Sequence, residues 1–96
     1  MKRKCENCKK ILERNAFISI EKGGDERIYS YFFCTECDKY TVELFRDLFV
    51  TGGSEISTFQ RDKEEGNKEV LLILDCPSPE DKNCKCSTHK DYFKSE

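Results

Sequence analysis

The chain has 96 residues, of which seven are cysteine, one is histidine and none is tryptophan. Only 36% of the residues are hydrophobic, 38% are charged, and the formal net charge is −2. A chain this short buries roughly 60–65% of its unfolded surface, so metal or covalent cross-links are needed for ordinary stability. Length and composition argue against a multidomain enzyme, a membrane protein and a large cofactor-binding fold, and the charge balance argues against a bulk basic field for nucleic acid.

The first fourteen residues form the basic part of the chain. They hold six positive and two negative side chains, and the candidates for a nucleic-acid contact are Lys2, Arg3, Lys4, Lys9 and Lys10. Because short charge runs are usually solvated surface, we interpret the basic end first as a solvated surface and only second as a nucleic-acid contact. No apolar stretch of signal-peptide length follows, and the longest apolar run, 70–74, is too short to span a membrane. We therefore expect a cytoplasmic protein.

Two C-x-x-C pairs enclose the next part of the chain, Cys5 with Cys8 and Cys34 with Cys37. In a reducing compartment, clustered cysteines bind metal more often than they form disulfides, and an odd number of cysteines cannot pair completely. Two intervening residues allow a tight turn to bring both sulfurs to about 2.3 Å from one ion, with turn amides directed at the thiolates. The spacing predicts one zinc ion held by all four thiols. Two independent redox dithiols, the alternative, lack a thioredoxin-like βαβ context.

Between the two pairs, residues 17–21 and 28–33 are rich in aromatic and β-branched side chains and predict two strands. Gly23 and Gly24 suit a hairpin turn between them. After Cys37 the apolar residues follow a helical spacing, at Tyr40, Leu44, Phe45, Leu48 and Phe49. This pattern predicts a helix that starts at Asp38 or Thr41 and ends before Gly52 and Gly53.

A cysteine turn, a hairpin and a second C-x-x-C pair at the start of a helix form an order of elements that resembles the treble-clef zinc fingers over residues 5–50. In that family the second ligand pair sits in the first helical turn, which Cys34 and Cys37 match. The resemblance implies a fold more than a function. A zinc ribbon, the competing arrangement, requires a strand after Cys37, and the helical spacing argues against one.

The second half of the chain begins with a joint at 51–54. Residues 56–59 and 70–74 predict two strands joined across 62–67, the second packed against the apolar stripe of the expected helix. The expected architecture is a small α+β zinc-binding domain, compact over 1–96, with a treble-clef-like half at 5–50 and a β-hairpin with a second zinc site at 55–96. Residues 90–94 predict a short terminal helix.

The second cysteine cluster has a less regular spacing. Its four candidate ligands are Cys76, Cys84, Cys86 and His89. Three cysteines with one histidine are a common structural zinc set, and three thiols otherwise lack a fourth donor. The sequence therefore predicts two zinc ions per chain. Interleaved pairing of the two clusters and an iron–sulfur cluster in place of zinc stay open as alternatives.

The predicted sites are closed, with no position left for water or substrate. Thiolate-rich ligation weakens zinc as a Lewis acid, and the only histidine is used as a ligand, so we expect neither an enzyme nor a small-molecule substrate. Nuclease activity is not expected either, because the nucleases that share the treble-clef layout depend on histidines that this chain does not have. The main hypothesis is a protein-interaction module without membrane contact, whose aromatic contacts come from Tyr29, Tyr31, Phe59, Tyr92 or Phe93. The alternatives are a nucleic-acid-binding or transcription-regulatory finger that uses the basic end, and a redox or metal switch.

Overall fold

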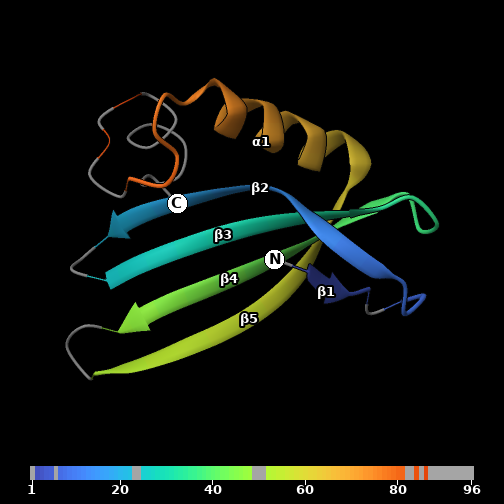
Figure 1. Cartoon of the computed structure of the whole chain (residues 1–96), viewed down its shortest axis with the longest axis horizontal. Coiled ribbons are helices and arrows are strands. Elements are labelled where there is room, and N and C mark those ends of the chain that lie inside the picture. Colours follow the sequence, from blue (N-terminus) through green and yellow to red (C-terminus); the bar gives the residue numbers. More distant parts are fainter. Residues whose placement is uncertain are drawn as a thin grey trace.

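Five antiparallel strands and one helix make up the computed structural model, which describes residues 2–5, 7–22, 25–48, 52–81, 84 and 86. Every strand pairs with its neighbour in sequence, in the order β1-β2-β3-β4-β5. The elements are β1 (Lys2–Lys4), β2 (Ile11–Lys22), β3 (Asp25–Cys34), β4 (Lys39–Leu48), β5 (Gly53–Asp62) and α1 (Lys63–Asp75). The sheet is curled, and α1 lies across one of its faces beside β2 (Figure 1).

The two strands predicted between the C-x-x-C pairs are confirmed within β2 and β3. They form a regular ladder from Phe17 opposite Ser30 to Glu21 opposite Glu26, while Gly23 and Gly24 lie outside the described residues. The register of β2 shifts between Arg14 and Ala16. Because such irregularities bend a strand and increase its twist, this shift contributes to the curl of the sheet between β1 and the rest.

The helix predicted after Cys37 is wrong, because residues 39–48 form strand β4. Alternate residues of β4, namely Tyr40, Val42 and Leu44, belong to the core beneath α1, which is the period-2 pattern of a strand packed on one face. The treble-clef arrangement depended on that helix and is not confirmed. The strand that a zinc ribbon requires after Cys37 is present.

The second predicted hairpin is also wrong. Its first strand, 56–59, lies in β5, but its second, 70–74, lies inside helix α1. The helix begins where the side chain of Asp62 accepts a hydrogen bond of 2.8 Å from the backbone N–H of Glu65, which caps the first turn. The predicted joint at 51–54 includes the turn into β5, where Gly52 adopts a φ of 74°. The predicted helix at 90–94 falls on residues that the structure does not describe.

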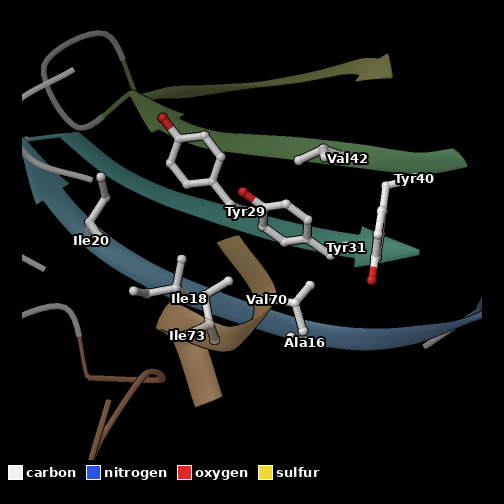
Figure 2. Packing of buried hydrophobic residues seen from close by; sticks show 9 residues of the cluster. All are labelled: Ala16, Ile18, Ile20, Tyr29, Tyr31, Tyr40, Val42, Val70 and Ile73. Atoms are coloured by element: carbon white, nitrogen blue, oxygen red, sulfur yellow. The ribbon is translucent and has the colours of Figure 1, made fainter. Parts of the chain in front are cut away.

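The main core lies between α1 and the sheet. Figure 2 shows its nine buried residues, which come from β2, β3, β4 and α1: Ala16, Ile18, Ile20, Tyr29, Tyr31, Tyr40, Val42, Val70 and Ile73. Helix α1 packs closely against the sheet because Gly66 has no side chain. A Cβ at that position would lie 2.1 Å from Cδ2 of Tyr40.

Candidate metal centres

The first cysteine cluster joins two turns at the same end of the sheet. Cys5 and Cys8 lie in the connection from β1 to β2, and Cys34 and Cys37 lie in the connection from β3 to β4 (Figure 1). All four sulfurs lie within 4.8 Å of one another. Because antiparallel pairing of β2 with β3 returns the chain to its starting end, the predicted set of four thiols is brought together as expected.

Both turns have the same backbone geometry. The N–H of Lys9 donates to the carbonyl of Cys5 at 2.9 Å, and the N–H of Asp38 donates to the carbonyl of Cys34 at 2.8 Å. Lys9 and Asp38, which each follow the second cysteine of a pair, have positive φ angles of 66° and 56°. This repeated turn places the two sulfurs of each pair on the same side of the loop. The two pairs therefore face each other as equivalent halves of one site.

The distances between the sulfurs fit a single tetrahedral ion. Sγ of Cys5 lies 3.9 Å from Sγ of Cys37, and Sγ of Cys8 lies 3.4 Å from Sγ of Cys34. A tetrahedral ion with metal–sulfur bonds of about 2.3 Å requires sulfur–sulfur separations of about 3.8 Å. All four cysteines are free thiols rather than disulfides. The cluster can therefore hold one metal ion with only small side-chain adjustments.

The surroundings of this cluster combine a buried base with an exposed rim. Cys5 and Cys34 are each 1% exposed and belong to a small core with Leu12 and Phe32, whereas Cys8 is exposed. Backbone N–H groups of Cys8 and Asn7 donate to the Cys5 sulfur and, despite its burial, lower the pKa of Cys5 to about 6. Burial, together with the neighbouring thiols, raises the pKa of Cys37 to about 12. A bound cation would favour deprotonation of every thiol in this cluster.

The second cluster lies at the carboxyl end of α1. Cys76 is the C-cap residue of the helix, and its sulfur lies 3.8 Å from that of Cys84 and 3.3 Å from that of Cys86. The three sulfurs are within 4.8 Å of one another. Burial raises the pKa of Cys76 to about 12. The chain that carries this cluster is tied to the sheet, because the N–H of Ser19 in β2 donates to the carbonyl of Pro79 at 2.8 Å.

The cluster therefore supplies three of the four predicted ligands, and the fourth, His89, lies outside the described residues. The structure does not interleave the cysteines of the two clusters. The first four form one group, and Cys76, Cys84 and Cys86 form the other. The residues missed by the sequence interpretation are those that shape the turns. Lys9 and Asp38 adopt the left-handed conformation, which is uncommon for residues other than glycine, and Asp38 was expected to begin a helix.

The basic amino-terminal residues are largely paired with acidic ones. Arg3 forms an ion pair of 2.7 Å with Glu43, and both side chains are less than one-fifth exposed. Lys2 lies 3.6 Å from Glu13, and Lys10 lies 4.0 Å from Glu36. These carboxylates offset the positive charge of β1 and the first cysteine turn. Lys2, Arg3 and Lys4 themselves form strand β1, which the sequence interpretation did not predict.

Two of the five aromatic residues predicted for a partner contact are buried in the structure. Tyr29 and Tyr31 are buried in the main core, and Phe59 packs against it. Tyr92 and Phe93 lie outside the described residues. The exposed large apolar side chains are instead Ile11, Ile56, Leu71 and Leu74, each more than half exposed. The most exposed large apolar side chains of the described residues are therefore aliphatic rather than aromatic.

Comparison with known proteins finds no family model, no curated protein and no solved structure that matches this chain. Within the described ranges, α1 is far too short and too polar for a helix that crosses a bilayer. The chemistry of the two cysteine clusters is therefore the main guide to function.

Proposed function

We propose that this chain binds two zinc ions as structural cross-links and presents the stabilised domain to a protein partner. The observation that carries the metal proposal is the convergence of two equivalent cysteine turns on one point, with all four sulfurs within 4.8 Å. Four free thiols at this spacing match the tetrahedral preference of zinc. In the proposed second site, His89 completes the set begun by Cys76, Cys84 and Cys86.

Zinc is preferred over other metals because its structural sites commonly use four cysteines, or three cysteines with one histidine. Site 1 would connect the β1–β2 and β3–β4 turns, and site 2 would hold the end of α1 beside β2. Both ligand sets are complete in this proposal, so no position remains for a substrate or an activated water. We therefore propose a role in which the metals support the fold rather than catalysis.

Native mass spectrometry of the purified full chain tests the metal proposal directly. We expect two zinc ions per chain in the wild type and one in Cys34→Ser or Cys84→Ser. Thr35→Ala changes a non-ligand side chain within the first site and should retain both ions. His89→Asn should weaken only the second ion. A chain that binds no zinc, or one that contains iron and acid-labile sulfide, would contradict the proposal.

Cobalt substitution adds a test of the ligand sets. Tetrahedral Co²⁺ bound to thiolates gives intense visible bands, and replacement of a thiolate by a nitrogen shifts them. We expect Cys84→Ser to leave the spectrum of a four-thiolate site, and Cys34→Ser to leave a distinct spectrum from three thiolates and one nitrogen. Identical spectra for the two variants would contradict the assignment of His89 to site 2.

The proposed role in protein binding is supported by the outer surface of α1. Leu71 and Leu74 are each 66% exposed, although their neighbours Val70 and Ile73 are buried. Lys68, Leu71, Leu72 and Asp75 line a shallow hollow on this surface. Capture of a stoichiometric partner from native lysate by the wild type, but not by Leu71→Lys with Leu74→Lys, would support the role. Absence of any stoichiometric partner would contradict it.

The basic amino-terminal end offers little free positive charge for nucleic acid, because Arg3, Lys2 and Lys10 each lie beside a carboxylate. The test is binding of mixed-sequence DNA and RNA at low salt, where electrostatic contacts are strongest. We expect no measurable binding. Salt-sensitive binding that is lost in Lys4→Glu would restore the alternative.

A further inference from the structure

The two edges of the sheet differ in how well they are protected from pairing with another strand. On one side β1 is only three residues long and contains two lysines, and the adjoining edge of β2 is partly covered where Ser19 bonds to Pro79. On the other side β5 pairs with β4 along its whole length, from Asp62 opposite Lys39 to Gly53 opposite Leu48. In the described part of the chain, no strand pairs with the outer side of β5.

The outer edge of β5 lacks most of the features that usually prevent association. Strand β5 contains neither proline nor lysine, and the β4–β5 register continues without a bulge. Short length, charged side chains, prolines and bulges are the devices that normally block pairing with another chain, and of these β5 carries only three charged residues, Glu55, Arg61 and Asp62. Ile56, near the middle of this strand, is 65% exposed. The edge is therefore a regular template for one additional antiparallel strand.

We propose that the occupant of this edge is β5 of a second copy, which joins the two sheets into one. A two-fold axis perpendicular to the sheet keeps each side chain on its own face, and opposite residues of an antiparallel pair share a face, so one residue must lie opposite its own copy. With Thr58 at the axis, Glu55 lies opposite Arg61 of the other copy, and Ser54 lies opposite Asp62. Every charged residue then avoids a like charge.

This register is selected by charge. A shift of the axis to Ser57 places Glu55 opposite Phe59, and a shift to Phe59 places Arg61 opposite Ser57, so neither arrangement pairs the two charges. The side chains of Glu55 and Arg61 are 59% and 38% exposed and so remain accessible to a second chain. Glu55 also lies 3.3 Å from Arg46, and Arg61 lies 3.2 Å from Glu69. Pairing would thus connect two existing ion pairs across the dimer.

Sedimentation equilibrium of the full chain with its bound metals, over a series of concentrations, tests this dimer. We expect a reversible monomer–dimer equilibrium. Thr58→Lys places two ammonium groups opposite each other at the axis and should abolish the dimer, whereas Thr58→Val keeps a β-branched side chain and should retain it. Circular dichroism verifies that each variant is folded.

The register is tested separately at Glu55. Glu55→Arg places like charges opposite each other at two symmetric positions and should weaken the dimer about tenfold, whereas Glu55→Gln should have a smaller effect. Leu71→Lys adds the same charge on α1 and should have none. The proposal is overturned by a wild type that is monomeric at every concentration, or by a folded Thr58→Lys that still dimerises. A dimer lost in Leu71→Lys instead would assign association to the helix, and one unaffected by Glu55→Arg would refute the register.

Discussion

Substitution of Gly66 by alanine gives a sharp test of how α1 packs on the sheet. Gly66 is buried against Tyr40, and an added Cβ would lie 2.1 Å from Cδ2, 2.6 Å from Cγ and 2.7 Å from Cε2 of that ring. The ring cannot rotate away freely. The centroids of the Phe33 and Tyr40 rings are 4.9 Å apart, and the Tyr40 hydroxyl donates to Oδ1 of Asn67 at 2.5 Å. The helix must therefore move outward or the ring must leave its site.

The size of the effect follows from three contributions. Overpacking of a well-packed core costs about 1–3 kcal/mol, and loss of the Tyr40–Asn67 hydrogen bond costs about 1 kcal/mol. Alanine regains about 1 kcal/mol because it favours the helix more than glycine does. We expect Gly66→Ala to lower the free energy of unfolding by about 2 kcal/mol, which corresponds to a Tm lower by about 10 °C.

Urea denaturation followed by circular dichroism, with bound metal held constant, measures this change. The matched control is the same substitution in a Tyr40→Leu background, where the smaller side chain leaves room for the Cβ. There we expect Gly66→Ala to be neutral or stabilising. Equal costs in both backgrounds, or a Gly66→Ala protein as stable as the wild type, would refute the packing argument.

The remaining predictions concern the metal sites and the start of the helix. Cys34→Ser or strong chelation should unfold at least the amino-terminal half, since structural zinc contributes roughly 10–16 kcal/mol against a usual net stability of about 5–15 kcal/mol; an unchanged circular dichroism spectrum would contradict this. Asp62→Ala should lower the free energy of unfolding by about 1 kcal/mol because it removes the N-cap, with Asp62→Asn as the control that retains it in urea titrations. Burial raises the pKa of Cys37 and Cys76 to about 12. Both thiols are therefore protonated near neutral pH without metal and release protons when it binds, so zinc affinity should fall as pH falls; a chelator competition that gives the same affinity at about pH 6 and about pH 8 would exclude this linkage.

The cysteine clusters were predictable because their spacing is a local property. A C-x-x-C turn places its two sulfurs together whatever the rest of the chain does, and only the meeting of Cys5 and Cys8 with Cys34 and Cys37 depends on the fold. That meeting required just the β2–β3 hairpin, whose aromatic and β-branched residues are clear in the sequence. For these reasons the grouping of the four thiols could be predicted from the sequence, whereas their binding of zinc stays a prediction.

Both errors in secondary structure arose because the spacing of apolar residues does not by itself show which of them the fold buries. The apolar residues of 40–49 fit a helical spacing, but Tyr40, Val42 and Leu44 also alternate, and their burial under α1 decides in favour of the strand. The run 70–74 is continuously apolar, and only the structure separates its buried residues from exposed Leu71 and Leu74. A local signal for α1 was present, because Asp62 followed by Glu65 is a pattern typical of a helix start.

The chain-neighbour order of the strands bears on how the protein is assembled during synthesis. The four thiols of the first site are complete once Cys37 has emerged, before any residue of β5 or α1 exists. A metal bound at that stage would hold the β2–β3 hairpin closed while the later strands add to its edge. The second cluster contains Cys76, Cys84 and Cys86, which follow α1 in the chain, so it can form only after α1 has been synthesised. If both proposed ions bind, one would act at the start of folding and the other at its end.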